Sequence, residues 1–400
     1  MSGATSPQPL AIAIVAAEES GDALGAALAQ ALLKAQNTVQ LSGVGGRAMA
    51  SAGISSPFAI DELAIIGLTA IPRRLPTILR RIRETADAIV KARPRALVIV
   101  DSPDFTHRVA RRVRRRAPEI PIIDYVSPSV WAWRPGRARA MRGYVDHVLA
   151  ILPFEPDAHR RLGGPHCTYV GHPLIERLAE LRPSFDEAAR RRADPPLILV
   201  LPGSRSGEVS RLTNVFGAAI ERLRARIGPL ELVLPTVAHL EPQLREITAG
   251  WAVAPKIVVE PIAKWAAFRR TRAALAASGT VTLELALSGV PMVAAYRLHF
   301  IEAAVARAIR LRARLPSVIL ANLVIGENVV PEYLQEESTP EQLSDALAAI
   351  VGDTQQRRRQ IAGFERLDAI MKIDGTSPSA KAAEIVLEAA RFGRKGMVPP

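Results

Sequence analysis

Two segments of this chain begin in the same way, with a short apolar run followed at once by a small polar turn. The first apolar run is Leu10–Ala17, and the second is Leu197–Leu201, nearly half a chain later. A strand, a small polar turn and an amphipathic stretch form the start of a doubly wound α/β domain, whose ligand loop lies at the carboxyl end of the first strand. The repeat therefore predicts two facing Rossmann-like domains with the active site in the cleft between them.

The rest of the chain fits this plan. Its 400 residues suit two domains of about 150–200 residues each, and strand-like runs alternate with helical patterns, which indicates parallel sheets. We expect the domains at 1–173 and 174–353, a polar connector at Arg182–Pro196, and a helical tail at 354–400 that packs back towards the first domain. The other predicted strands are Val39–Val44, Ala96–Val100, Pro121–Val126, His147–Leu152, Thr168–Val170, Glu231–Leu234, Lys256–Glu260, Ala273–Ala277 and Pro291–Tyr296.

Charge and composition limit the function classes. The net charge of +13 indicates an anionic partner, although solvated arginines are an alternative explanation. Aromatic residues make up only 4% of the chain and form no stripe with basic residues, which argues against nucleic acid. The single cysteine, Cys167, is typical of a reducing compartment, and no apolar stretch reaches the ~18–20 residues of a spanning helix. We expect a cytoplasmic protein.

An aspartate directly follows the predicted strand Ala96–Val100. At that position the carboxylate of Asp101 faces the ligand crevice and can remove a proton from a substrate hydroxyl, unless neighbouring amides satisfy it in the interior. Asp104 is expected to cap a helix that starts at Phe105 or Thr106. The two carboxylates lack the Asp-x-Asp spacing of metal-dependent sugar transferases, so we expect no metal.

Three further loops are candidates for ligand contacts. In the first, Glu18 to Asp22, Gly21 allows close backbone approach and Ser20 can cap the next helix, while Asp22 is either a ligand contact or a complement to the helix dipole. Pro202–Glu208 is a phosphate-type loop with Gly203, Ser204 and the guanidinium of Arg205.

The third loop, Ser278–Glu284, follows another buried strand. Gly279 and Thr280 open a helix that can hold a diphosphate, and Glu284 can bind ribose hydroxyls; a plain capped helix is the alternative. The stretch Tyr125–Trp133 contains Ser127, Trp131 and Trp133 and either lines a sugar or acyl pocket or forms a rigid packed loop.

These segments together resemble the lipid-A-disaccharide synthases, a family of glycosyltransferases of the GT-B type. The resemblance extends from about Ile12 to Ala390, and its most specific motifs are YVSPSVWAW at Tyr125–Trp133 followed by LPGSR at Leu201–Arg205. The other matching segments are ESGD at Glu19–Asp22, DSPDF at Asp101–Phe105, ASGT at Ala277–Thr280 and LPSVILANLVIGENVVPEYLQ at Leu315–Gln335. The chain departs from the family pattern at Ala17, where glycine is usual, and at Thr106, where asparagine is usual.

The resemblance implies roles for particular residues. It implies catalytic roles for Asp101 and Glu18, without deciding which is the general base, and a phosphate contact for Arg205. Asn322 and Gln335 match donor-side positions of the family. With the loops above, the expected donor-binding set is Gly203, Ser204, Arg205, Gly279, Thr280, Glu284, Asn322 and Gln335, and the acceptor or acyl-binding set is Ser20, Asp22, Ser127, Trp131 and Trp133.

The reaction that the resemblance implies joins UDP-2,3-diacylglucosamine to 2,3-diacylglucosamine 1-phosphate (lipid X), with inversion and without a cofactor. It gives the β-1,6-linked disaccharide 1-phosphate and UDP. A homodimer is a possible oligomeric state of such a protein. The alternatives are another UDP-sugar enzyme of this architecture, such as a UDP-N-acetylglucosamine epimerase or a peptidoglycan transferase, and a basic nucleic-acid-binding protein without activity.

Acylated substrates imply a peripheral position on the inner face of the cytoplasmic membrane. Ile65, Ile66, Leu68 and Ile71, with Arg73 and Arg74, are the expected membrane contacts. They precede a helical stretch with Leu75, Ile78, Leu79, Ile82 and Ile89 on one face and arginines on the other. We expect that face at an anionic membrane surface, and an ordinary core-facing helix is the alternative.

Overall fold

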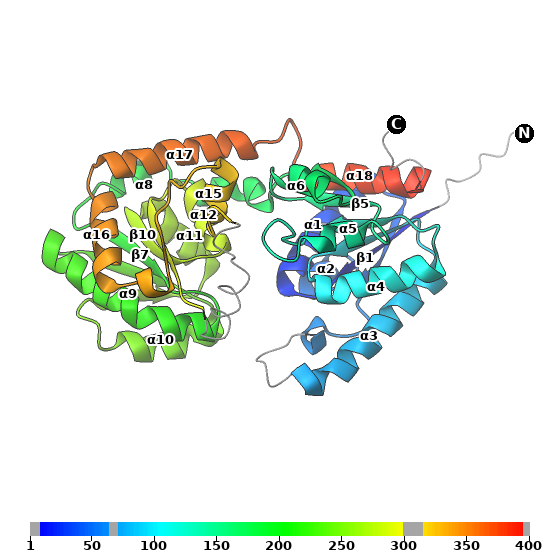
Figure 1. Cartoon of the computed structure of the whole chain (residues 1–400), viewed down its shortest axis with the longest axis horizontal. Coiled ribbons are helices and arrows are strands. Elements are labelled where there is room, and N and C mark those ends of the chain that lie inside the picture. Colours follow the sequence, from blue (N-terminus) through cyan, green and yellow to red (C-terminus); the bar gives the residue numbers. More distant parts are fainter. Residues whose placement is uncertain (1–8, 64–70, 299–314, 395–400) are drawn as a thin grey trace, which may run out of the picture. The chain divides into compact units, whose positions relative to one another are not determined.

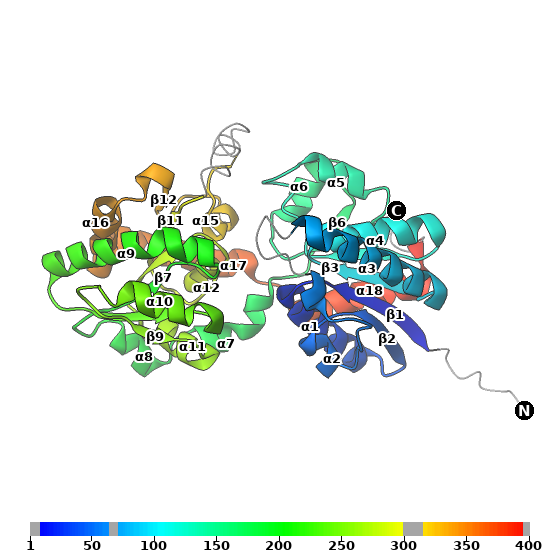
Figure 2. The same ribbon diagram turned by 90° about the horizontal axis from the view of Figure 1, so that it is seen from below.

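The computed structural model describes residues 9–63, 71–298 and 315–394, with the side chains of 71–74 left out. The chain forms two compact units, each described here by itself: Met1–Ile175 with Ile373–Pro400, and Glu176–Lys372. Figures 1 and 2 show that each unit is a sheet with helices on both faces. The prediction of two Rossmann-like α/β domains is confirmed.

The first unit contains a six-stranded parallel sheet with the strand order β2-β1-β3-β4-β5-β6. Because β2 lies on one side of β1 and β3 on the other, the strand order reverses between β1 and β3. Its elements are β1 (Leu10–Ala16), α1 (Glu19–Ala35), β2 (Val39–Val44), α2 (Arg47–Ser51), η1 (Ile60–Leu63), α3 (Ile71–Ala92), β3 (Ala96–Val100), α4 (Pro103–Arg116), β4 (Ile122–Tyr125), α5 (Gly136–Met141), β5 (His147–Ala150), α6 (Glu155–Arg161), β6 (His166–Tyr169) and α18 (Pro378–Phe392); η3 (Pro173–Arg177) joins the two units.

The two faces of this sheet belong to two separate apolar clusters. Alternate residues of a strand point to opposite faces, so Ile12 and Ile14 pack against α1 and α18, whereas Ala13 and Val15 pack against α3 and α4. Strands covered on both sides read as continuous apolar runs, which is why the sequence located β1 and β3 well. Helix α18 lies beside α1 although more than 340 residues separate them in the chain (Figure 1).

The apolar face of α3 belongs to the core of the first unit. Ile78, Ile82 and Ile89 are buried against β1, β3 and α4, so the expectation that they lie at a membrane is wrong. An amphipathic pattern has the same form whether a sheet or a lipid surface covers it. Leu75, at the start of the helix, is 42% exposed. No helix among the described residues is long and apolar enough to cross a bilayer.

The second unit contains another six-stranded parallel sheet, with the order β12-β11-β10-β7-β8-β9. This is the strand order of a Rossmann fold, and it reverses between β7 and β10. Its elements are α7 (Leu178–Leu181), α8 (Phe185–Arg190), β7 (Leu197–Leu201), α9 (Ser206–Ile227), β8 (Glu231–Pro235), η4 (Ala238–Leu240), α10 (Glu241–Thr248), β9 (Lys256–Val258), α11 (Pro261–Arg270), β10 (Ala273–Ala277), α12 (Thr280–Leu287), β11 (Met292–Tyr296), α15 (Leu320–Ile325), β12 (Glu332–Leu334), η5 (Gln335–Glu337), α16 (Pro340–Val351) and α17 (Gln355–Met371).

The predicted polar connector at Arg182–Pro196 contains a short helix, α8. Its N-cap is Ser184, whose hydroxyl accepts a hydrogen bond from the Glu187 amide while the Glu187 carboxylate accepts one from the Ser184 amide. This reciprocal pair is a capping box, and the Ser-x-x-Glu spacing is its sequence signal. The connector is therefore better ordered than its polarity suggested.

The residues after 353 divide between the two units. Helix α17 packs on α12, α15 and α16 and belongs to the second unit, whereas α18 packs on α1 in the first. The expected single tail at 354–400 is therefore two elements with different partners. One reason is the fully buried Gln360 of α17, whose side-chain amide donates to the carbonyl of Met292 and accepts from its N–H. Met292 begins β11 before β12 runs alongside it, so Gln360 takes the place of a neighbouring strand.

Replacing Gln360 should destabilise the second unit. In Gln360→Leu both backbone groups of Met292 lose their partner in the interior, at a cost of ~1–3 kcal/mol for each group. We expect a lower denaturant midpoint, measured by circular dichroism. Gln356→Leu changes an exposed residue of the same helix and is the matched control. Equal midpoints for the two variants would show that Gln360 does not hold α17 on the sheet.

Candidate functional site

The reversal of strand order in the first unit brings two polar loops together. Ala17 to Ser20 follow β1, and Asp101 and Ser102 follow β3, its neighbour in the sheet. In α/β sheets ligands bind outside the carboxyl ends of the strands at such a reversal. The Ser20 hydroxyl lies 3.4 Å from the Asp101 carboxylate, so the structure brings these two predicted residues together.

The backbone at Asp101 is strained and firmly held. Asp101 and Ser102 have φ values of 51° and 45°, in the left-handed region that residues other than glycine rarely adopt. The Asp101 amide donates to Tyr125, and the Thr106 hydroxyl donates to the Asp101 carbonyl at 2.6 Å. Thr106 thus fixes the turn at the position where the sequence departs from the family pattern. The Ser102 hydroxyl is buried without a partner among the described residues.

The neighbouring carboxylates differ in what they contact. Helix α4 begins at Pro103 with Ser102 as its N-cap, so Asp104 lies exposed in the first turn and the predicted cap at Asp104 is wrong. Glu18 is the exposed N-cap residue of α1, and its carbonyl accepts from the Asp22 amide at 2.8 Å. Glu18 and Asp101 therefore follow adjacent strands at the same edge of the sheet.

Asp22 supports the fold through hydrogen bonds to a second helix. It is only 4% exposed, and its carboxylate accepts hydrogen bonds from the amides of Gly46, Ala48 and Met49 at 2.6–3.0 Å. These amides form the first turn of α2, whose N-cap, Gly46, has no side chain to satisfy them. Asp22 thus caps a helix other than its own, and its predicted contact with the acceptor stays a prediction.

The stretch that follows β4 is mostly packed. Ser127 is buried, and its hydroxyl lies 2.8 Å from Nε2 of His159. The ring of Trp131 packs edge-on against Phe154. Trp133 is 42% exposed, with the guanidinium of Arg134 over its ring. Of these three predicted acceptor contacts, only Trp133 has a largely open side chain.

Glu155 was not predicted, and it ties this stretch to the next strand. Its carboxylate accepts from the indole N–H of Trp131 at 3.3 Å and from the Leu152 amide at 3.0 Å. Burial raises the pKa of Glu155 to about 8. A second buried group joins Nε2 of His107 to Asp124 at 3.1 Å and Nδ1 of His107 to the Tyr144 hydroxyl at 3.0 Å. No sequence motif marks either group, because the partners come from different elements.

The reversal in the second unit places the phosphate-type loop after β7. Gly203 has a φ of 125°, and a Cβ there would lie 2.5 Å from the Glu208 carboxylate, so only glycine fits. The carboxylate of Glu208 accepts from the Ser204 amide at 3.2 Å and from Arg205 at 3.3 Å. Glu208, which the sequence argument left without a role, therefore shapes the loop. The side chain of Arg205 is 81% exposed at the N-terminus of α9, where a phosphate is favoured.

The loop after β10 lies on the other side of the same reversal. Gly279 is the exposed N-cap of α12, and Thr280 is exposed at the first helical position. The carboxylate of Glu284 forms an ion pair of 2.7 Å with Lys264, so the predicted ribose contact already has a cationic partner. The structure thus brings together Arg205, Gly279 and Thr280, each following one of two adjacent strands.

Two residues transferred from the family pattern have internal partners. Asn322 is 1% exposed; its amide nitrogen donates to Ser317 and Val330, and its oxygen accepts from the amides of Val329 and Val330. This uses every hydrogen bond that the side chain can make, so Asn322 positions the segment, and its predicted contact with the donor stays a prediction. Gln335 is half-buried, and its side-chain oxygen accepts from the Leu298 amide at 2.7 Å.

Two further expectations bear on the site. The membrane contacts Ile65, Ile66 and Leu68 lie outside the described residues, as do the side chains of Ile71, Arg73 and Arg74. Among the residues that are described, no group of three or more histidine, cysteine, aspartate or glutamate side chains could hold a metal ion.

The chain is similar to proteins of one named family over nearly its whole length. The family model described as lipid-A-disaccharide synthetase matches residues 12–386. The lipid-A-disaccharide synthase of Bradyrhizobium diazoefficiens is 58% identical over 96% of this chain and 97% of its own. That of Rhodospirillum centenum is 42% identical over 95% of this chain and 94% of its own.

Solved structures with the same fold are more distant in sequence. The UDP-GlcNAc 2-epimerase of Neisseria meningitidis, bound to UDP-GlcNAc, has a TM-score of 0.59 at 11% identity and covers 95% of this chain and 98% of its own. MurG of Acinetobacter baumannii has a TM-score of 0.57 at 18% identity, with 95% and 99% covered. At these identities the likeness shows the fold alone.

The raised pKa of Glu155 predicts a pH-dependent stability. Because Glu155 titrates at about 8 when folded and at its ordinary, lower value when unfolded, the folded state binds more protons between these values. The free energy of unfolding should therefore fall by about 1 kcal/mol from pH 7 to pH 8. His147 and His172, whose pKa values burial lowers to about 4, contribute mainly below this window.

Denaturant unfolding of the wild-type protein and of Glu155→Gln at both pH values measures this effect. We expect the pH dependence to be much weaker in Glu155→Gln and unchanged in Glu119→Gln, a control at an exposed residue of the same unit. An equal decrease in all three proteins would assign the effect to other groups.

Proposed function

The chain belongs to the lipid-A-disaccharide synthetase family and is a glycosyltransferase, and on that basis we propose how it forms its disaccharide. The proposed donor is UDP-2,3-diacylglucosamine, and the proposed acceptor is 2,3-diacylglucosamine 1-phosphate. The products are the β-1,6-linked tetraacyl disaccharide 1-phosphate and UDP. The observation that carries this proposal is the position of Asp101 and Arg205, each at the reversal of strand order in its own sheet.

Asp101 is the proposed general base. A sugar hydroxyl is a weak nucleophile, so it needs a positioned carboxylate to take its proton as it attacks. Asp101 is only partly exposed, is held by Thr106 and lies beside the Ser20 hydroxyl, which keeps its carboxylate in one place. Glu18, exposed after the neighbouring strand, is proposed to contact the acceptor next to it.

Arg205 is the proposed contact of the leaving group. When the acceptor oxygen forms its bond to the anomeric carbon, the bond from that carbon to the diphosphate breaks and negative charge develops on UDP. The guanidinium of Arg205 and the free amides at the start of α9 and α12 can stabilise that charge without a metal ion. A single displacement of this kind inverts the anomeric configuration.

The acyl chains of both substrates favour a reaction at a membrane. We therefore propose that the protein acts peripherally on the inner face of the cytoplasmic membrane, with the segment from Ile65 to Arg74 as its contact. Co-sedimentation with vesicles that contain phosphatidylglycerol measures this association, and exchange of Ile66, Leu68 and Ile71 for serine should weaken it. Unchanged sedimentation of that variant would remove the segment from the proposal.

The substrate assignment is tested directly by product analysis. The protein is incubated with radiolabelled acceptor 1-phosphate and either the diacylated donor or UDP-N-acetylglucosamine, and the products are separated by thin-layer chromatography. We expect a disaccharide 1-phosphate with the diacylated donor only. A product formed equally well from the unacylated donor, or epimerisation of that donor, would contradict the proposed substrates.

Removing the proposed base should slow the reaction without unfolding the protein. Asp101→Asn keeps the shape of the side chain but cannot take a proton, so we expect kcat to fall by ~10²–10⁴. Asp104→Asn removes an exposed carboxylate three residues away and should retain wild-type kcat. Comparable rates for the two variants would exclude Asp101 as the base.

Removing the proposed diphosphate contact should act on the donor. In Arg205→Gln we expect kcat/KM for the donor to fall about tenfold to a hundredfold, because a charge-assisted bond to phosphate is lost. Arg205→Lys should recover only part of this loss, since the forked guanidinium geometry does not return. Arg222→Gln, on the exposed side of the same helix, is the control. A shift confined to the acceptor KM would place Arg205 elsewhere in the mechanism.

A further inference from the structure

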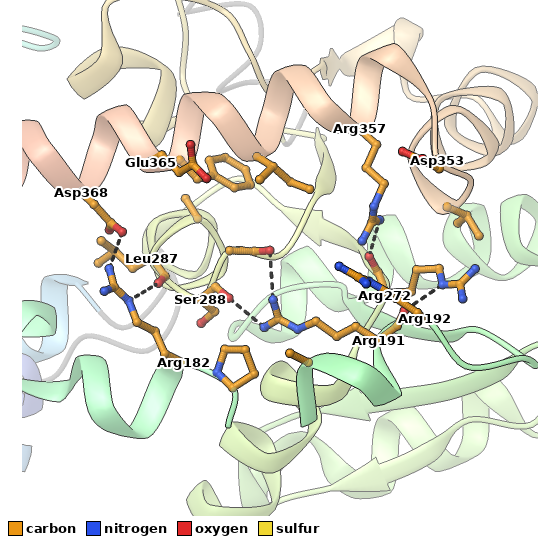
Figure 3. A pocket seen from close by; sticks show the side chains of 17 residues that line it. Arg182, Arg191, Arg192, Arg272, Leu287, Ser288, Asp353, Arg357, Glu365 and Asp368 are labelled. Atoms are coloured by element: carbon orange, nitrogen blue, oxygen red, sulfur yellow. Dashed lines mark hydrogen bonds and ion pairs between the residues drawn. The ribbon is translucent and has the colours of Figure 1, made fainter. Parts of the chain in front are cut away.

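The second unit contains an arginine-rich pocket whose place in the fold differs from that of the donor loops. It has a volume of about 910 Å³, and five arginines line it: Arg182, Arg191, Arg192, Arg272 and Arg357. Figure 3 shows Arg182 and Asp368 at one end, Arg192, Arg272 and Arg357 at the other, and the guanidinium of Arg191 between them beside Ser288. We call these four, Arg191, Arg192, Arg272 and Arg357, the arginine cluster.

The pocket lies at the amino-terminal edge of the sheet. Arg191 and Arg192 precede β7, Arg272 immediately precedes β10, and Ser288 and Gly289 precede β11. The loops that contain Arg205 and Gly279 follow strands of this same parallel sheet. The arginine cluster and the proposed diphosphate site therefore lie at opposite edges, and one ligand phosphate cannot occupy both.

Backbone carbonyls hold the buried members of the cluster in place. Arg191 donates to the carbonyls of Phe268, Arg269, Ser288 and Gly289 at 2.7–3.2 Å. Nη1 of Arg357 donates to the carbonyls of Arg272 and Ile350. Carbonyl oxygens orient a guanidinium but carry no full negative charge, so these bonds fix the positions of the cations without neutralising them.

The carboxylates at this pocket leave the cluster with an excess of positive charge. Asp353 lies at the pocket but pairs with Arg358 at 2.9 Å, and Asp368 pairs with Arg182 at the other end. Glu365 also lines the pocket, and its charge acts on Asp368. Asp194 reaches Arg272 only at 3.6 Å, and its side chain is 84% exposed. Among the described residues, the ion pair of the four cations is this weak, solvated one, and the charges of Asp353 and Glu187 offset part of the repulsion at Arg357 and Arg191.

The effect of this crowding appears in the arginines themselves. Burial, followed by the charge of Arg357, lowers the pKa of Arg191 to about 10. Burial, followed by the charge of Arg272, lowers the pKa of Arg357; the charge of Asp353 opposes this shift, and that of Arg192 adds to it. Within the described residues, the side chain of Arg192 is exposed and makes no hydrogen bond or ion pair, and Nε and Nη2 of Arg357 make none either. Forked donors thus remain available at the cluster.

We propose that the arginine cluster binds a phosphate group, carried by a free phosphorylated molecule or by a lipid headgroup. Phosphate is the anion that arginine binds through two parallel hydrogen bonds, and several fixed guanidinium groups match its several oxygens. The pocket is large enough to take a diphosphate or a small phosphorylated molecule. This site is additional to the proposed function and does not depend on it.

Equilibrium binding of inorganic diphosphate to the full chain tests the proposal. Isothermal titration calorimetry is carried out at low salt with saturating UDP, so that a UDP-binding site elsewhere does not contribute. We expect binding near one equivalent, with at least a tenfold higher Kd in Arg192→Gln. Arg190→Gln makes the same charge change at an exposed residue outside the pocket lining and should bind as the wild-type protein does.

Two comparisons make the outcome decisive. Arg205→Gln should leave this binding unchanged, which separates the pocket from the proposed donor site. Floatation with vesicles of phosphatidylglycerol and phosphatidylcholine distinguishes the sources: a loss in Arg192→Gln, relative to Arg190→Gln, assigns a lipid headgroup, and binding of diphosphate alone assigns a free molecule. The absence of both kinds of binding, or equal losses in the Arg190 and Arg192 variants, would overturn the proposal.

Discussion

The reversal of strand order in each sheet is the constraint on which the site depends. In a parallel sheet the carboxyl ends of all strands lie at the same edge, and the crossover helices that follow them cover one face or the other. Where the order reverses, two consecutive crossovers leave in opposite directions, and the loops between them remain uncovered. Asp101 and Ser20 meet at one such place in the first unit. In the second unit Arg205 and Thr280 follow the two strands that flank the reversal. The order of the strands thus determines where the candidate site residues can lie, whatever their side chains are.

The part of the site that lies directly after strands was predictable from the sequence. Buried strands give continuous apolar runs, so the ends of β3 and β7 could be located, and with them Asp101 and Arg205. The internal hydrogen bonds of Asp22 and Asn322 were not predictable, for the opposite reason. Their partners, such as the amides of Ala48 and Val330, come from other elements, and no local pattern states that two elements will meet. A polar residue in a motif reads the same whether it faces a ligand or caps a neighbouring helix.

The arginines illustrate a second limit of sequence reasoning. A net charge of +13 suggested an anionic partner, but guanidinium groups such as those of Arg95, Arg191 and Arg211 donate to backbone carbonyls and so support the fold. The guanidinium of Arg191, for example, joins α11 to the loop before β11 through four hydrogen bonds. The same ambiguity affected α3. Its helical periodicity defined an apolar face correctly but could not show what covers that face, which is the apolar cluster with residues of β1, β3 and α4. Composition and periodicity describe the surface of one element at a time, whereas function depends on which surfaces stay exposed after the elements have packed together.

The position of α18 has a consequence for the order in which the protein can fold during synthesis. One face of the first sheet is completed by Ala382, Val386 and Ala390, which pack against β1, β3 and α1. The whole second unit, Glu176–Lys372, leaves the ribosome before these residues do. The second unit can therefore mature while the first still exposes an apolar sheet face to solvent and to chaperones. A nascent chain stalled before α18 would present a finished second unit attached to an incomplete first unit.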